Sequence, residues 1–130
     1  MALNQFGAVM TFAIELENQL TAFYEQAAAP GGAHADIFKQ RAEDAIKRRK
    51  RIEQSRRSDV TEITLEPIEG LDEAAYQLDL SRHDSVAVNQ IERIVQQFYT
   101  DAAPKINVRE SRKVLERCLK EHASLMPLPE

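Results

Sequence analysis

The chain of 130 residues has the length of one ordinary domain, and its 17 basic and 21 acidic residues leave a net charge of −4. This balance gives no overall attraction to nucleic acid or anionic lipid. The single cysteine, Cys118, excludes an intramolecular disulfide framework, and we expect a reducing, cytoplasmic setting. No segment approaches the roughly 20 uninterrupted apolar residues of a membrane helix. We therefore expect a single domain over 1–130 with no membrane contact.

Four segments with helical periodicity predict an all-α protein. The expected helices cover 3–29, 35–57, 84–103 and 108–126. Pro30 and two glycines separate the first pair, Pro104 ends the third helix, and Asn107 offers an N-cap for the fourth. Residues 58–83 alternate apolar and polar side chains, which favours a long crossover with a short helix from Asp72 to Leu80. This order predicts a four-helix bundle of two helical hairpins.

A repeated ending links the first and third helices, because FYEQAAAP at 23–30 returns as FYTDAAP at 98–104. Counting back six residues from each phenylalanine gives Glu17 and Glu92. Both glutamates lie in stripes that step by three or four residues and so face the bundle axis. The stripes comprise Leu3, Phe6, Met10, Ala13, Glu17, Leu20, Tyr24 and Ala27 in the first helix, and Ser85, Val88, Glu92, Val95, Tyr99 and Ala102 in the third.

The other two helices also carry ionisable residues at inward positions. In the second helix the stripe offers a choice between Arg48 and Arg49, and in the fourth it contains His122. His122 is either a metal ligand or an ordinary histidine of the core or surface. The remaining stripe positions are Phe38, Ala42, Ala45 and Ile52 in the second helix, and Val108, Ser111, Leu115, Cys118 and Leu125 in the fourth.

The segment AIELENQLTAFYEQAA, with a second helix that opens on Phe-Lys, resembles the rubrerythrin-type branch of the ferritin-like superfamily. The resemblance implies a carboxylate-bridged metal pair, with one Glu from each of two helices and a Glu-x-x-His from each of the others. It places the single glutamates on Glu17 and Glu92. The two Glu-x-x-His pairs fall on Ala45 with Arg48, and on Leu119 with His122. Half of the implied ligands are therefore replaced.

Two glutamates and one histidine cannot balance the charge of a di-iron site. We therefore expect no ferroxidase or peroxidase chemistry and no resident cofactor. A guanidinium can satisfy carboxylates with paired hydrogen bonds and replace the charge of a lost metal. Our hypothesis is a metal-free polar core, with the two tyrosines donating hydrogen bonds across it, that comprises Glu17, Arg48, Glu92, Tyr24, Tyr99 and His122.

Three functions follow from these patterns. The first is a non-catalytic, degenerate ferritin-like bundle that acts as a homodimer or with another protein, through surface that includes Val9, Phe12 and Ile14. The alternative is a metal-handling or oxidoreductase protein with iron or another divalent metal on Glu17, Glu92 and His122. The third is a basic adaptor for an anionic polymer, because residues 47–57 hold seven Lys or Arg. That run lacks an aromatic residue for base stacking, which disfavours nucleic acid.

Overall fold

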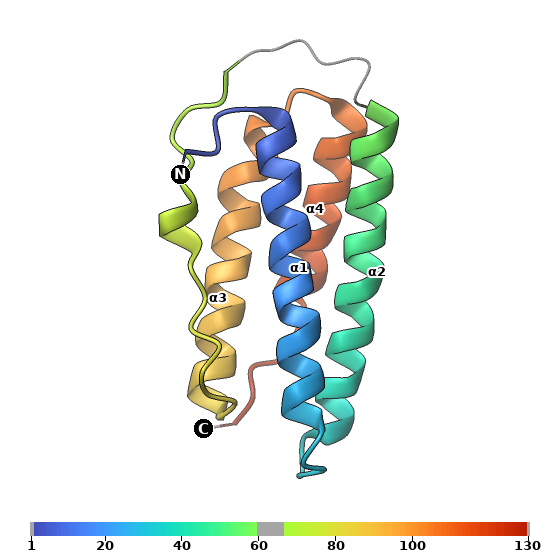
Figure 1. Cartoon of the computed structure of the whole chain (residues 1–130), viewed down its shortest axis with the longest axis vertical. Helices are drawn as coiled ribbons and strands as arrows, with labels where there is room; N and C mark the ends of the chain where they lie inside the picture. Colours follow the sequence, from blue (N-terminus) through green and yellow to red (C-terminus); the bar gives the residue numbers. More distant parts are fainter. Residues whose placement is uncertain (1, 60–66, 130) are drawn as a thin grey trace.

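The computed structural model describes residues 2–59 and 67–129. Within them the chain forms α1 (Phe6–Ala28), α2 (Ala35–Asp59), α3 (Ser85–Ala102) and α4 (Arg109–Ala123), with short 3-10 turns η2 (Glu73–Tyr76) and η3 (Ala103–Lys105). The four helices lie side by side along the long axis of the molecule (Figure 1). The described chain is thus all-helical, as predicted, and its arrangement is compatible with a four-helix bundle.

Helix α1 begins three residues later than the sequence predicts. The backbone N–H of Leu3 donates to the carbonyl of Leu71 at 2.9 Å, and Asn4 accepts from the N–H of Ile68 at 2.9 Å. Residues that pair with another segment in this way adopt extended backbone, so the helix starts only at Phe6. The pairing also ties the start of the chain to the crossover.

The ends of the later helices follow local capping chemistry. Asp84 caps α3, where its side chain accepts from the N–H of Ala87 at 3.0 Å. The predicted cap of α4 is wrong by one residue, because Val108 and not Asn107 holds the N-cap position, without a side-chain bond. Helix α4 ends at Ala123 rather than 126, and residues 124–129 form a segment that we call the C-terminal strap.

The crossover contains less helix than expected. The predicted helix from Asp72 to Leu80 is a four-residue 3-10 turn, which the Asp72 carboxylate caps by accepting from the N–H of Ala74 at 2.9 Å. At Gln77 the backbone is already extended. Helix α2 continues to Asp59, and residues 60–66 of the predicted crossover lie outside the described residues.

The crossover covers the apolar surface that we assigned to dimer formation. Phe12 packs against Tyr76 of η2, with ring centroids 6.3 Å apart, and against Phe98 of α3 at 5.2 Å. Val9 is fully buried as well, and Ile14 is half-buried. The assignment of Val9 and Phe12 to an outer surface is therefore wrong, because the pattern on α1 did not reveal that the crossover packs against this face.

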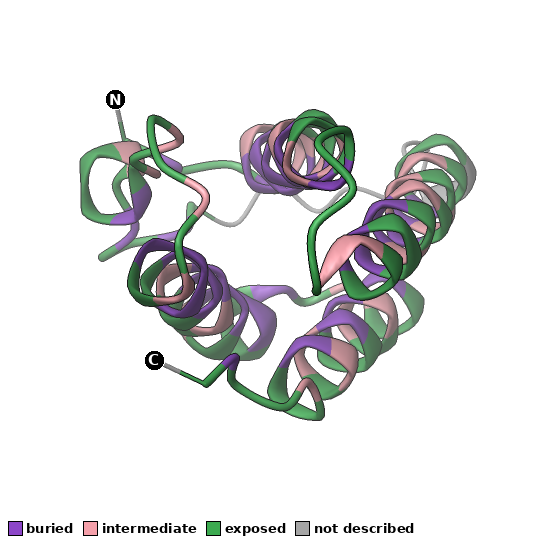
Figure 2. Cartoon of the chain, turned by 90° about the horizontal axis from the view of Figure 1, so that it is seen from below, coloured by how far each residue is buried: buried purple, intermediate pink, exposed green. Residues whose placement is uncertain are grey.

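The buried residues of the four helices lie mainly on the sides of the ribbons that face a common interior (Figure 2). Most are apolar, and they include most positions of the predicted stripes, whereas Ala27, Ser85, Val108 and Leu125 are only half-buried. Near the middle of the helices the interior changes character and contains buried charged groups. In the described part of the chain, none of the helices has the length and apolar character that crossing a membrane requires.

Candidate functional site: a buried network of charges

Each of the four helices contributes to one buried polar cluster. Glu17 and Tyr24 come from α1, Arg48 from α2, Glu92 and Tyr99 from α3, and His122 from α4. The most exposed of the six residues, Glu92, has only 5% of its surface accessible. We call these six residues the polar core. The structure brings together all six residues named by the sequence hypothesis, and Arg48 rather than Arg49 points inward.

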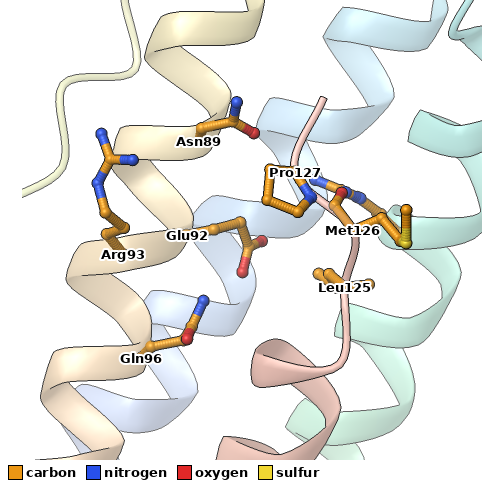
Figure 3. A pocket seen from close by; sticks show the side chains of 8 residues that line it. Asn89, Glu92, Arg93, Gln96, Leu125, Met126 and Pro127 are labelled. Atoms are coloured by element: carbon orange, nitrogen blue, oxygen red, sulfur yellow. The ribbon is translucent and has the colours of Figure 1, made fainter. Parts of the chain in front are cut away.

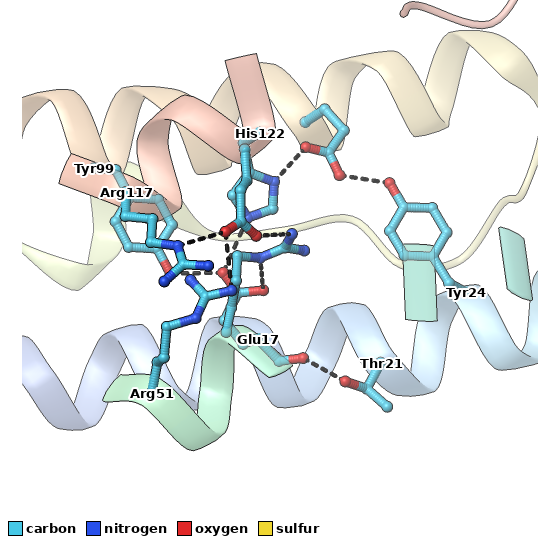
Figure 4. Close-up of polar contacts among 10 residues, drawn as sticks. Glu17, Thr21, Tyr24, Arg51, Tyr99, Arg117 and His122 are labelled. Atoms are coloured by element: carbon cyan, nitrogen blue, oxygen red, sulfur yellow. Dashed lines mark hydrogen bonds and ion pairs between the residues drawn. The ribbon is translucent and has the colours of Figure 1, made fainter. Parts of the chain in front are cut away.

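The carboxylate of Glu17 has three hydrogen-bond partners. Its Oε1 accepts from Nε of Arg48 at 2.9 Å, and its Oε2 accepts from the Tyr99 hydroxyl at 2.6 Å. The Nε2 atom of His122 lies 2.9 Å from the same Oε2 (Figure 4). Charged hydrogen bonds of this kind repay the desolvation of a buried carboxylate. Glu17 can therefore stay ionised inside the bundle.

Glu92 has a related but smaller set of partners. Its Oε1 accepts from the Tyr24 hydroxyl at 2.6 Å, and its Oε2 lies 2.7 Å from Nδ1 of His122. The tyrosine of α1 thus binds the glutamate of α3, while the tyrosine of α3 binds the glutamate of α1. This reciprocal exchange is the structural counterpart of the repeated sequence motif.

His122 bridges the two carboxylates through both of its ring nitrogens. A neutral imidazole has only one N–H, so its other nitrogen would direct a lone pair at a carboxylate oxygen. Burial disfavours the charged ring, but Glu92 and Glu17 outweigh burial and raise the pKa of His122 to about 9. At neutral pH the residue is therefore an imidazolium that donates to both glutamates.

The remaining groups of the polar core are held in the complementary charge states. Burial tends to raise the pKa of Glu17 and of Glu92, yet His122, with Arg48 beside Glu17 and Tyr24 beside Glu92, holds both below the usual range. Burial and the adjacent carboxylates raise the pKa values of Tyr24 and Tyr99. Two anions therefore face two cations, Arg48 and His122, and the tyrosines stay neutral donors.

The structure adds an outer group of charged side chains that the sequence pattern did not reveal. Glu121 accepts from Nη1 of Arg48 at 3.4 Å and pairs with Arg51 at 2.9 Å and Arg117 at 3.3 Å (Figure 4). The available signal was the position of Glu121 next to His122. This partly exposed carboxylate connects the polar core to the surface.

Arg41 is a second residue that the sequence reading missed. It lies seven residues before Arg48, hence on the same helical face, and only 5% of its surface is exposed. Its Nη1 donates to the Tyr24 hydroxyl at 3.3 Å, and its Nη2 donates to the carbonyl of Met126 at 2.9 Å. The seven-residue spacing could have identified it.

The donor set does not fit a di-iron site. Ala45 and Leu119 stand where the resemblance expects glutamates, and neither side chain can bind a metal. Arg48 places a guanidinium 2.9 Å from Glu17, where a second cation would be repelled. Among the described residues, no group of three or more His, Cys, Asp or Glu side chains could hold a metal ion.

The basic run on α2 is divided between the interior and the surface. Arg48 enters the polar core, Arg51 pairs with Glu121, and Arg49 donates to Asn18 at 3.1 Å. The exposed members of the run are Lys47, Lys50, Arg56 and Arg57. Because three of the seven bases already have partners on this chain, the surface offers fewer cations to an anionic polymer than the sequence indicates.

A small cavity of about 70 Å³ adjoins the polar core at Glu92, beside the C-terminal strap (Figure 3). The strap is fixed to α3, because Asn89 donates to the carbonyl of Leu128 and accepts from its N–H, both at 2.9 Å. The volume is large enough for water. The lining residues are Arg41, Asn89, Glu92, Arg93, Gln96, Leu125, Met126 and Pro127.

Comparisons with known proteins found no protein-family model, no curated protein and no solved structure that matches this chain. The likeness to ferritin-like proteins therefore stays a prediction from the sequence.

Proposed function

We propose that the protein is a non-catalytic, rubrerythrin-like member of the ferritin-like bundles, and that it acts by associating with itself or with another protein. The observation that carries this proposal is the charge balance of the polar core. Arg48 and His122 supply the positive charge that two buried glutamates need, and they do so at short distances. A core neutralised in this way needs no metal for its stability.

The same observation opposes a catalytic role. The ionisable side chains at the centre are buried and already hydrogen-bonded to one another, so a substrate would have to break these bonds to reach them. Cys118 is buried too, and burial together with Glu17 raises its pKa to about 12, which keeps the thiol protonated. We therefore favour a function in which the outer surface of the bundle binds another protein or a second copy of this chain.

Metal analysis tests the central part of the proposal. We expect protein produced with iron, manganese and zinc in the medium to contain far less than one metal ion per chain after gel filtration. Its free energy of unfolding should not change when metal or chelator is added. A metal ion stabilises a protein only when it binds the folded state in preference to the unfolded state, and we expect no such binding here. Stoichiometric metal that disappears in Glu17→Ala would instead support the altered metal site.

Association is tested separately. Light scattering of the pure protein across a range of concentrations distinguishes a stable homodimer from a monomer. A monomer at all concentrations would exclude self-association and leave only association with a different protein. Affinity capture tests for such a partner, with the destabilised variant Arg48→Met as the control. Capture that does not depend on the folded bundle would count against the proposal.

A further inference from the structure

An open groove lies on the other side of the C-terminal strap from the small cavity. It has a volume of about 560 Å³ and runs between the first turns of α2 and the strap. Volumes of this size are typical of small-molecule sites. The lining residues are Asp36, Ile37, Gln40, Arg41, Asp44, Leu125, Met126, Pro127, Leu128 and Pro129.

The walls of this groove are largely apolar and reach solvent. Ile37 is 42% exposed and Met126 is 81% exposed, and both line the groove. They are two of the three large apolar side chains that are exposed in the described part of the chain. An apolar chain that covered them would remove their surfaces from water, which favours binding in proportion to the area buried.

Arg41 gives the groove a buried positive charge. Its two hydrogen-bond partners, the Tyr24 hydroxyl and the Met126 carbonyl, are neutral, and no carboxylate in residues 2–59 and 67–129 lies within ion-pair distance of its guanidinium. Arginine has five N–H groups, so these two bonds leave three for a ligand.

Arg41 has nearby carboxylates but is not directly bonded to any of them in residues 2–59 and 67–129. Glu92 is near enough for the charge of Arg41 to help lower its pKa, but its hydrogen-bond partners are Tyr24 and His122 and not Arg41. Two acidic residues also line the groove, the exposed Asp36 and Asp44, which accepts from Gln40 at 3.0 Å, and neither forms an ion pair with Arg41. A buried guanidinium that is not directly bonded to a carboxylate is stabilised by an anion that accepts its free N–H groups.

We propose that this groove binds a small monocarboxylic acid with an apolar chain. The carboxylate receives charge-assisted hydrogen bonds from the Arg41 guanidinium, and the chain lies against Ile37 and Met126. Neither part is sufficient alone, because the anion is selected by Arg41 and the chain by the apolar walls. The site does not depend on how the bundle associates with other proteins.

The test is an NMR titration of the amide resonances of the whole chain with octanoate. Neutral 1-octanol has the same chain without the charge, and acetate has the charge without the chain. We expect octanoate to shift the resonances of the first turns of α2 and of the strap, and to bind at least about tenfold more tightly than either control. Equal affinity for octanoate and 1-octanol, or shifts confined to other helices, would overturn the proposal.

Two variants and one matched control complete the test. Arg41→Gln should weaken octanoate binding by at least about tenfold, while Arg93→Gln, which changes an exposed arginine outside the groove, should leave it unchanged. Because Arg41 also contacts Tyr24, Ile37→Ser provides a variant that leaves the polar core intact. Undiminished binding by Ile37→Ser would contradict the proposed position of the chain.

Discussion

The two glutamates of the polar core occupy equivalent places in the repeated sequence but have different surroundings. Glu17 accepts hydrogen bonds from Arg48, Tyr99 and His122, whereas Glu92 has Tyr24 and His122 and lies beside a small cavity. The difference comes from α2, since its Arg48 donates to Glu17 and not to Glu92, whereas His122 of α4 contacts both glutamates. A repeat therefore fixes where two carboxylates lie, while the neighbouring helices decide how each is neutralised.

Removing the guanidinium on the Glu17 side should have the largest effect. In Arg48→Met, Glu17 loses a cation at 2.9 Å while it remains buried. Stranding a buried charge in this way typically costs about 3 to 5 kcal/mol of unfolding free energy. Urea denaturation measures the loss. The neighbouring Arg49→Met, in a side chain that is 30% exposed, is the control and should cost much less. Equal losses in both would show that Glu17 does not depend on Arg48.

The second test raises the pH until His122, which contacts both glutamates, loses its charge. The pKa of His122 is raised from 6.5 to about 9 in the folded chain. Its contribution is therefore fully present below about pH 6.5 and is lost as the pH rises through 9, for a total of up to about 3 kcal/mol. Urea denaturation from pH 6 to 10 measures this fall.

The variant His122→Gln provides the reference for that pH series. It cannot titrate, so its stability should be lower at pH 6 and should change less up to pH 10. On the acid side, the lowered pKa values of Glu17 and Glu92 contribute stability above about pH 4.5, and this part is lost as the pH falls through their folded values. A stability of the parent chain that stays constant from pH 7 to 10 would show that His122 is already neutral when folded.

Variants of the two tyrosines allow a direct comparison of Glu17 and Glu92. Each variant to phenylalanine removes one hydroxyl at 2.6 Å from a glutamate. Hydrogen bonds to charged groups contribute roughly 1.5 to 3 kcal/mol. We expect Tyr24→Phe to lie at the upper end, because Glu92 keeps only His122 and Arg41 loses an acceptor. Tyr99→Phe should lie at the lower end, since Glu17 keeps Arg48. Thermal denaturation of both variants measures the two losses of stability. Equal losses would contradict the expected difference between Tyr24→Phe and Tyr99→Phe.

The smallest effect is expected for the partly exposed charges around Glu121, outside the polar core. Arg117 is 65% exposed and pairs with Glu121 at 3.3 Å, while Arg51 remains on the same carboxylate. Exposed pairs contribute about 0 to 1 kcal/mol. Arg117→Ala should therefore reduce the unfolding free energy by about 0.5 kcal/mol or less, and the difference should vanish in 1 M salt. A larger loss that persists at high salt would place Arg117 among the structural residues.

The sequence predicted much of this arrangement because helical periodicity depends on spacing along a single chain. Glu17, Glu92, Arg48 and His122 all followed from the stripes, since a polar residue in an apolar series is visible without knowledge of its partners. Phe12 was misplaced because the segment that covers it, around Tyr76, lies more than sixty residues away and has no helical period.

Arg41 and the strap escaped prediction for a related physical reason. The partners of Arg41 are a hydroxyl on α1 and a backbone carbonyl at Met126, and a main-chain acceptor leaves no mark in the side-chain pattern. The same holds for the bonds between Asn89 and Leu128, both of which use backbone atoms of the strap. Side-chain patterns identify what a helix buries, but not which loop comes to lie over it.

The reciprocal tyrosine bonds also constrain the order of folding. They connect residues 68 and 82 positions apart in the chain, whereas Glu17 and Arg48 belong to one hairpin, and Glu92 and His122 belong to the other. A hairpin made alone can thus pair its charges but cannot supply the hydroxyl that its carboxylate needs in a dry interior. Contacts between distant residues form late, because the intervening chain must first be closed into a loop. During synthesis the first hairpin must therefore keep its charges hydrated until α3 emerges, and neither half should persist as a folded fragment.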